Sequence, residues 1–350
     1  MRYLKLLPLL AFCCFKLQAQ TLDKNKQYNV AVVGFWNVEN LYDTLNDQWK
    51  NDEDFTPDGV NAWSGPRYRQ KLEHLSDVIS QMGTDANPDG LAILGLCEIE
   101  NKSVVQDLVN TPKLKARNYQ IVHVEGPDAR GVDPSFIYNP KYFKVTAYTS
   151  YHVKYITDTT HKTRDQLVVS GLLNGEPVTV IVNHWPSRRG GEMKSRPNRI
   201  SAAESARRIT DSIVKADPKA KVIIMGDLND DPTSKSVKKY LNTSGDFNNV
   251  KDGQLFNAME NYYIQGTGTL AWDDAWNLFD QIIMTKPFVK GDYKDWQYYT
   301  ARIFNKPFVK QEYGNFKGYP LRTYAGGVYT AGYSDHFAVY VLLMKELVKK

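Results

Sequence analysis

The stretch KVIIMGDLNDDP (residues 221–232) carries the clearest structural signal in the chain. It starts as a short apolar run and ends abruptly in glycine, carboxylates, an amide and proline, which is typical of a buried strand that delivers acidic groups to a loop. Asp227 and Asn229 are two residues apart, so they project from one face if the chain stays extended. Such a pair suits Mg²⁺ or a water held against a phosphate. An Asx-rich turn explains the same residues equally well.

Other apolar, strand-like runs resolve this ambiguity, because they also end in, or contain, groups able to bind a metal or transfer protons. Any one of them could be an ordinary turn or cap, but several such strand ends together favour one site at the rim of a sheet, where ligands usually bind. Besides Asp227 and Asn229, the residues concerned are Asn37, Glu98, His184, Asp280, Asp335 and His336.

Arginines near these strand ends are candidates for gripping phosphate oxygens, because a guanidinium group presents a fork of donors. Arg188 and Arg189 follow His184 in the loop SRRGG, and Arg130 lies in the loop 125–131. The alternative for each is a solvated charge on an ordinary surface loop.

Length and composition favour one large globular domain. The chain has 350 residues, of which 42% are hydrophobic and 12% aromatic, so core material is plentiful. Strand and helix patterns alternate, with a hairpin signal at Asn174-Gly175 and amphipathic helices at 68–82 and 200–214. No repeats or linker-like segments interrupt residues 21–350, which we expect to form a single α+β domain with mixed sheets. The aromatic, basic segment 288–329 gives no clear pattern.

Residues 1–20, MRYLKLLPLLAFCCFKLQAQ, have the basic start, apolar middle and small Ala19 of a secretory signal peptide. The sequence therefore predicts a secreted or periplasmic protein. Cleavage would remove Arg2, Lys5 and Lys16 and lower the formal net charge from +5 to +2, so binding to a polyanion would depend on local patches. Cys97 would then be the only cysteine of the mature chain, in an apolar run typical of a buried strand.

Taken together, the chain resembles the endonuclease/exonuclease/phosphatase superfamily, which includes exonuclease III-like and deoxyribonuclease I-like nucleases. The resemblance covers about residues 30–343 and is jointly specific, although each motif is weak by itself. The motifs, in the family's order, are WNVEN (36–40), LCEIEN (96–101), VNHWPSRRGG (182–191), MGDLNDDP (225–232), FDQIIMT (279–285) and YSDHFAVYV (333–341).

This resemblance implies a four-layer α/β/β/α sandwich, in which two mixed β-sheets are flanked by helices and the active site lies at one end. It also implies that Glu98 is the chief metal ligand, with Asn37 beside it and Asp335 assisting. Asp227 and Asn229 would hold the attacking water or contact the phosphate.

The two histidines receive their roles from the same resemblance. His336 would act as base or bind phosphate, oriented by Asp280, and the sequence leaves open whether His336 or Asp227 takes the proton. His184 matches the second catalytic histidine of the deoxyribonuclease branch, and Glu125 is expected to orient it. A His–Asp pair with its pKa near neutrality suits proton transfer in phosphodiester hydrolysis.

The resulting hypothesis is a secreted Mg²⁺-dependent phosphodiesterase, an endonuclease acting on extracellular nucleic acid. The oxygen donors around Glu98 favour Mg²⁺, with Mn²⁺ as the other option, over Zn²⁺. We expect a monomer with no protein partner and no stable membrane insertion. The alternatives are a phosphatase or phospholipase C-like enzyme acting on inositol phosphate or sphingomyelin, and a non-catalytic binding module.

Overall fold

The computed structural model describes residues 22–347 except Lys24, His161 and Asp273, and its framework consists of two large β-sheets. The first is mixed and has six strands in the order β14-β17-β1-β2-β4-β3. Strand β1 runs parallel to β2 and antiparallel to β17. The strands of this sheet are β1 (Tyr28–Leu41), β2 (Leu91–Ile99), β3 (Gln120–His123), β4 (Asp133–Tyr138), β14 (Gln297–Phe304) and β17 (Ala338–Glu346).

The second sheet is also mixed and has seven strands in the order β5-β6-β7-β8-β13-β10-β9. Strand β7 runs parallel to β8, whereas β13 runs antiparallel to β8. The strands are β5 (Phe143–Tyr151), β6 (Gln166–Leu173), β7 (Glu176–His184), β8 (Val222–Asp227), β9 (Thr243–Ser244), β10 (Leu255–Asn257) and β13 (Asp280–Met284).

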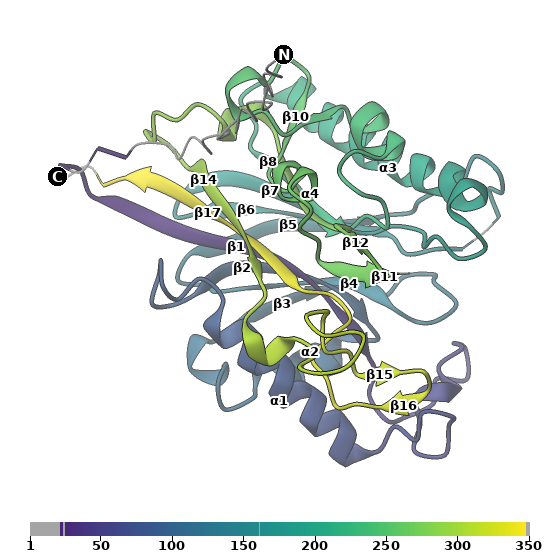
Figure 1. Cartoon of the computed structure of the whole chain (residues 1–350). Helices are drawn as coiled ribbons and strands as arrows, with labels where there is room; N and C mark the ends of the chain where they lie inside the picture. The colour runs from purple at the N-terminus through teal and green to yellow at the C-terminus, as the bar shows by residue number, and fades with distance from the viewer. Residues whose placement is uncertain (1–21, 24, 161, 273, 348–350) are drawn as a thin grey trace, which may run out of the picture.

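Helices cover the outer face of each sheet, as Figure 1 shows, with α3 above one sheet and α1 and α2 below the other. The central core cluster joins residues of both sheets, such as Phe35 and Phe136 with Val182 and Met225. Gly95 in β2 lets the sheets approach closely, because a Cβ there would lie 2.6 Å from Met225 Sδ. The helices are α1 (Gly65–Gln81), α2 (Lys102–Val109), α3 (Glu192–Ala216) and the short α4 (Glu260–Ile264).

The predicted four-layer α/β/β/α sandwich is therefore confirmed. Two further apolar clusters form the outer layers: one packs α1 and α2 on the six-stranded sheet, and the other packs α3 on the seven-stranded sheet. Most of the predicted elements are present, including the β6–β7 hairpin, whose turn has Asn174 at φ 43° and Gly175 at φ 89°.

Two segments differ from the sequence-based expectation. Helix α3 begins at Glu192, well before the predicted start at residue 200, and contains Pro197. The unassigned segment 288–329 contains β14, an edge strand paired with β17. It also contains the short strands β15 (Tyr324–Ala325) and β16 (Val328–Tyr329), which lie near α1 in Figure 1. A second small hairpin is formed by β11 (Leu270–Trp272) and β12 (Ala275–Asn277).

The predicted signal peptide, residues 1–20, lies outside the described residues, so it stays a prediction. Within the described part of the chain, no helix is long and apolar enough to span a bilayer. Cys97 is a buried free thiol, as its apolar surroundings in the sequence indicate, and burial raises the pKa of that thiol above its usual value.

Candidate active site

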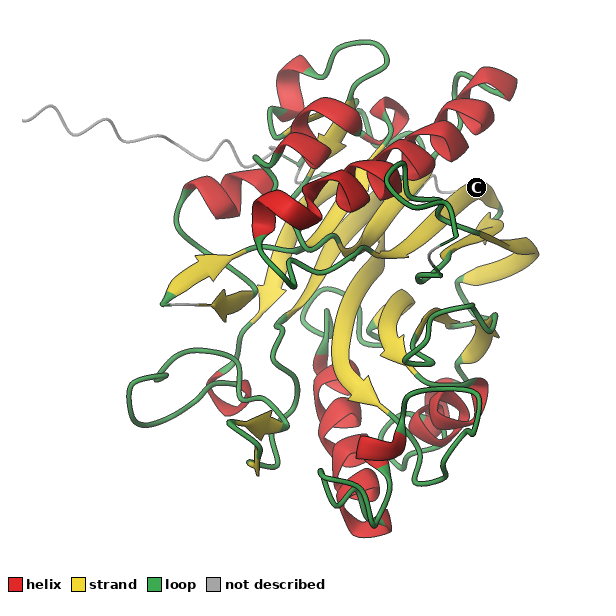
Figure 2. Cartoon of the chain, turned by 90° about the vertical axis from the view of Figure 1, so that its right-hand side faces the viewer, coloured by secondary structure: helices red, strands yellow, loops and turns green. Residues whose placement is uncertain are grey.

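The predicted site residues meet at one end of the sandwich because of strand direction. The parallel strands β1 and β2, and likewise β7 and β8, finish at this end, whereas the antiparallel strands β13 and β17 begin there. It is the right-hand end of the molecule in Figure 1, and it faces the viewer in Figure 2. Register then places Asp227 beside both His184 and Asp280 on the neighbouring strands.

Asp227 lies at the centre of this group and is almost completely buried. Its Oδ2 accepts a hydrogen bond from Asn37 Nδ2 at 2.9 Å, and its Oδ1 accepts one from the backbone N–H of Asn229 at 2.9 Å. Gly226, one residue earlier, allows β7 and β8 to approach, because a Cβ there would lie 2.3 Å from the carbonyl oxygen of Asn183. Burial raises the pKa of Asp227 to about 6, although the His336 imidazole opposes this shift.

His336 forms a close pair with Asp280, 2.7 Å from His336 Nδ1 to Asp280 Oδ2. Its other ring nitrogen, Nε2, lies 3.8 Å from Asp227 Oδ2 and 3.9 Å from Asp335 Oδ1. Burial would lower the pKa of this imidazole, but the charges of Asp280, Asp335 and Asp227 together raise it well above its ordinary value. In the metal-free protein His336 is therefore a buried imidazolium.

His184 faces the same carboxylate from the opposite strand. Its Nε2 lies 3.8 Å from Asp227 Oδ2 and 3.8 Å from Glu98 Oε1. Burial, reinforced by Arg164, Arg130 and His336, lowers the pKa of His184 well below its ordinary value, so this imidazole is neutral. Its Nδ1 has no hydrogen-bond partner among the residues that the structure describes.

The residues predicted to bind a metal are Glu98, Asn37 and Asp335, which offer oxygen atoms only. Glu98 Oε2 accepts the backbone N–H of Asn40, whereas Oε1 has only long contacts among the described residues, 3.7 Å to Arg130 and 3.8 Å to His184. Glu98 Oε1 therefore retains lone pairs for a cation. This donor set fits a hard divalent ion such as Mg²⁺.

Backbone conformation at the site is unusual. Glu39, Asn40, Glu98 and Asn229 all have left-handed φ values, between 48° and 61°. The β1–β2 pairing shifts register between Asn37 and Leu41, which marks a bulge. Left-handed backbone costs roughly 1 kcal/mol or more at a residue other than glycine, and such strain concentrates at functional sites.

The structure contradicts the expected role of Glu125 and shows that Arg188, predicted to bind phosphate, is already bound to two carboxylates. Glu125 does not reach His184; its exposed carboxylate contacts His123 instead, 3.1 Å from Glu125 Oε1 to His123 Nε2. Arg188 was predicted to hold phosphate, but its guanidinium already donates to Asp230, at 3.1 Å, and to Asp231, at 3.0 Å. Phosphate binding by Arg188 would therefore require those bonds to break.

The other two arginines stay available to a ligand. Arg130 lies at the rim of the site with its side chain 42% exposed, beside Glu98 and bonded to Asn40 Oδ1. Arg189 is exposed on the loop before α3. Phosphate binding by either residue stays a prediction.

Three residues that the structure places at the site, Glu39, Lys71 and Arg322, were not among the predicted site residues. Glu39 is buried, lies 4.0 Å from Lys71 Nζ in α1, and accepts the backbone N–H of Thr323 at 2.6 Å. Burial raises the pKa of Glu39 to about 7. Arg322 lies 2.9 Å from Asp335 Oδ2 and 3.7 Å from Glu39 Oε1, so it connects the loop before β15 to the proposed metal ligand. Glu39 lies in the WNVEN motif, two residues after Asn37, and this position is the feature of the sequence that could have identified it as a site residue.

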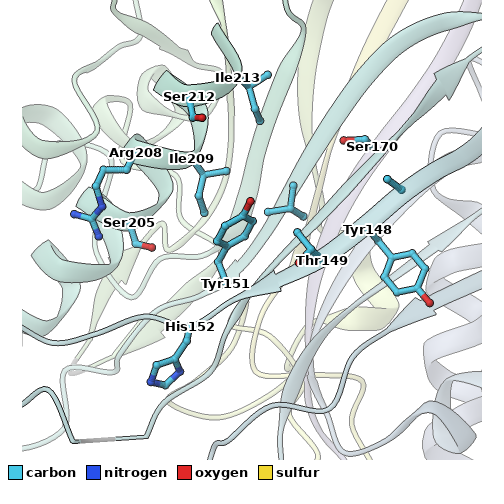
Figure 3. Close-up of a pocket in the computed structure, with 12 residues that line it drawn as sticks. Tyr148, Thr149, Tyr151, His152, Ser170, Ser205, Arg208, Ile209, Ser212 and Ile213 are labelled. Carbon is cyan, nitrogen blue, oxygen red and sulfur yellow. The ribbon is translucent and has the colours of Figure 1, made fainter. Parts of the chain in front are cut away.

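A groove elsewhere on the surface is separate from this site. It lies between β5 and α3 and is about 530 Å³ in volume, and Tyr148, His152, Ser170 and Arg208 are among its lining residues (Figure 3). None of the predicted site residues lines it.

Comparison with known proteins gives the family of the chain. The sequence profile of the endonuclease/exonuclease/phosphatase family matches residues 32–345. The chain belongs to the endonuclease/exonuclease/phosphatase family. Its members are phosphoester hydrolases that depend on a divalent metal. No curated protein sequence matches the chain significantly.

Solved structures with the family fold are similar over nearly the whole chain. A truncated Caenorhabditis elegans TDP2 is 18% identical, with a TM-score of 0.54, over 90% of this chain and 97% of that one. A D. rerio TDP2, complexed with a single-strand DNA product, is 15% identical, with a TM-score of 0.53, over 90% and 98%. A Bacteroides thetaiotaomicron mannosyl-6-phosphatase is 14% identical, with a TM-score of 0.53, over 89% and 99%. At these identities the likeness establishes the fold.

Proposed function

We propose that this protein is a secreted, Mg²⁺-dependent phosphodiesterase that cleaves extracellular nucleic acid internally. The observation that carries the proposal is the His336–Asp280 pair, in which the second ring nitrogen of His336, Nε2, faces Asp227, the carboxylate to which Asn37 donates. Phosphodiester hydrolysis needs an oriented water, neutralised phosphoryl oxygens and a proton for the leaving group. Each requirement has a suitable group at this end of the sandwich.

Asp227 is the better candidate for the base, because burial raises its pKa only to about 6, whereas the carboxylates around His336 raise the pKa of that imidazole well above its ordinary value and favour its protonated form. Asp227 accepts a proton from the attacking water, and the backbone N–H of Asn229 holds the carboxylate in place. The Nε2–H group of the His336 imidazolium, whose Nδ1 is held by Asp280, donates its proton to the leaving oxygen as the P–O bond breaks. Neutral His184 donates a hydrogen bond to the phosphoryl group.

Glu98, Asn37 and Asp335 would hold the divalent cation. A bound Mg²⁺ supplies charge neutralisation at the phosphoryl oxygens. Glu98 Oε1 supports this assignment, because its contacts with Arg130 and His184 are 3.7 and 3.8 Å long, which leaves the oxygen open to a cation in the described part of the chain.

Nucleic acid is the proposed substrate because a protein of the same fold was crystallised with a single-strand DNA product. Two cationic side chains, Arg130 and Arg322, lie at the rim of the site with 42% and 45% of their surface exposed. The basic and apolar pattern of residues 1–20 supports secretion, and we propose that the protein acts as a monomer. The alternative is a phosphatase, since the fold also occurs in a mannosyl-6-phosphatase, or a phospholipase C-like enzyme.

A substrate panel with Mg²⁺ tests the proposal: plasmid DNA, RNA, bis-p-nitrophenyl phosphate, p-nitrophenyl phosphate, sphingomyelin and inositol polyphosphates. We expect cleavage of plasmid DNA or RNA and of the diester, with loss of both on adding EDTA or in Glu98→Gln. Turnover limited to monoesters or lipid would contradict the nuclease assignment. Unchanged turnover in Glu98→Gln would contradict the proposed site.

A further inference from the structure

A second group of metal-ligating side chains lies between strands β3 and β4. His123 is the last residue of β3, Asp133 is the first of β4, and Glu125 lies in the connecting loop. One ligand atom from each of these residues lies within 4.8 Å of the others. The mechanism proposed above uses none of them.

Two of these side chains are buried with a polar atom that has no partner. The His123 side chain is 1% exposed, and its Nδ1 has no hydrogen-bond partner among the described residues. Asp133 is 0% exposed; its Oδ2 accepts the backbone N–H of Gly126 at 2.8 Å, whereas its Oδ1 is likewise unpartnered in the described part of the chain. An unsatisfied buried group costs about 1–3 kcal/mol, so Asp133 Oδ1 favours a cation at this cluster, where His123 Nε2 lies 3.1 Å from Glu125 Oε1.

We propose that His123, Glu125 and Asp133 form a second metal site, which binds a transition-metal dication of the Zn²⁺ class. One imidazole nitrogen with two carboxylates is a donor set that suits Zn²⁺, in contrast to the oxygen-only set at Glu98. Three protein ligands leave a coordination position for water. The Glu125 side chain is 59% exposed, which opens the site to ions from solvent.

An ion at this site would hold the loop between β3 and β4 in place. Glu125 and Asp133 flank the loop 126–132, so an ion bound to both side chains would link the two ends of the loop. Arg130 in this loop lies 3.7 Å from Glu98 Oε1. Lys50 Nζ also holds this loop, because it donates hydrogen bonds to the carbonyl oxygens of Gly126 and Asp128. The second metal therefore fixes the segment that places Arg130 beside Glu98.

Thermal unfolding with and without ZnCl₂, at saturating Mg²⁺, tests the site without measuring turnover. We expect Zn²⁺ to raise the Tm of the parent protein by several degrees, and His123→Ala and Asp133→Asn to lose this rise. Glu98→Gln should keep it, which separates this site from the proposed catalytic metal.

The matched control is His152→Ala. This change removes another histidine paired with a carboxylate, since His152 Nδ1 lies 3.0 Å from Asp165 Oδ1 at the exposed groove of Figure 3. The control should keep the full Zn²⁺ response. A response retained in His123→Ala, or lost in Glu98→Gln or His152→Ala, would overturn the proposal.

Crystals of the parent protein provide a test that requires no variant to fold. After soaking in ZnCl₂, data collected at the zinc absorption edge should give an anomalous difference peak between His123 and Asp133. The absence of a peak at that position would overturn the proposal, whatever the enzyme is found to cleave.

Discussion

His336 and His184 face the same oxygen, Asp227 Oδ2, each with its Nε2 at 3.8 Å, yet they carry different charges. Both rings are almost fully buried, so exposure to water does not distinguish them. The neighbours do: His336 is surrounded by the carboxylates of Asp280, Asp335 and Asp227, which raise its pKa, whereas Arg164 and Arg130 add to the effect of burial and lower the pKa of His184.

This difference shows that the charge of a buried histidine is set by the elements packed around it. His336 lies just before β17 of the six-stranded sheet, and it pairs with Asp280 at the start of β13 of the seven-stranded sheet. The starts of two strands from different sheets therefore form the part of the site that contains the imidazolium. His184 ends β7, where the N–H groups of the Arg164 side chain reach the carbonyl oxygen of Trp185 at 2.9 Å. Substituting the charged neighbours of His336 or His184 should therefore change the difference in charge between the two histidines in predictable ways.

The largest effect is expected from Asp227→Asn, which removes the carboxylate that both histidines face. Loss of the proposed base should lower kcat for bis-p-nitrophenyl phosphate by about 10⁴-fold, the upper end of what proton transfer contributes. Steady-state kinetics with Mg²⁺ measure it, and circular dichroism verifies folding.

Asp165→Asn is the matched control, because Asp165 also pairs with a histidine but away from the site. It should leave kcat unchanged. A kcat for Asp227→Asn within tenfold of the parent would rule out Asp227 as the base.

A smaller loss, about 10²-fold in kcat, is expected from Asp280→Asn, because proton transfer by a misplaced acid contributes less. Replacing the Asp280 carboxylate, which raises the pKa of His336, should also lower the pKa of the imidazolium. If His336 acts as the proton donor, activity is lost as pH rises through this pKa, so the alkaline limb of the kcat profile should move to lower pH. An alkaline limb at the parent position would exclude His336 as the titrating group.

The two histidines should also have opposite effects on stability in metal-free protein. The pKa of His184 is lowered in the folded state, so its contribution to stability is present above pH 6.5 and is lost as pH falls below that value. The pKa of His336 is raised, so its contribution is full below pH 6.5 and is lost as pH rises through the folded value.

Urea unfolding across pH 5–9 should show a flatter acidic limb in His184→Gln and a flatter alkaline limb in His336→Gln, each relative to the parent. Identical pH dependence in the two variants would refute the difference between the histidines.

The smallest effect is expected from Arg130→Gln at the exposed rim of the site. A partly exposed charge pair contributes up to about 1 kcal/mol, so KM should rise by roughly two- to fivefold, with little change in kcat. The pKa of His184 should rise, because one of the cations that lower it has been removed. A drop in kcat of more than tenfold would give Arg130 a larger role than phosphate binding.

The strand-end residues of the site were predictable because the signal is local. Asp227, His184 and Glu98 each follow an apolar run, and the direction of such runs in a mixed sheet brings them to one edge. The two-sheet sandwich follows from the same runs and from the order of the motifs.

The rest depends on which side chains meet in three dimensions. Arg188 turns to Asp230 and Asp231 instead of outward, and Glu125 turns to His123. The Glu39–Lys71 pair joins a bulged strand to a helix, and its connection to Thr323 comes from a segment without periodic pattern. The spacing of residues in the sequence does not predict which side chains Arg188, Glu125 and Glu39 contact.

Histidine titration by NMR tests the central claim, that Asp227 is flanked by one charged and one neutral imidazole, most directly. Nitrogen-15 shifts of metal-free protein at pH 7.5, assigned with His336→Gln and His184→Gln, give both protonation states. We predict imidazolium shifts for His336 and neutral imidazole shifts for His184. Two neutral histidines, or the reverse assignment, would contradict the proposed division of roles between them.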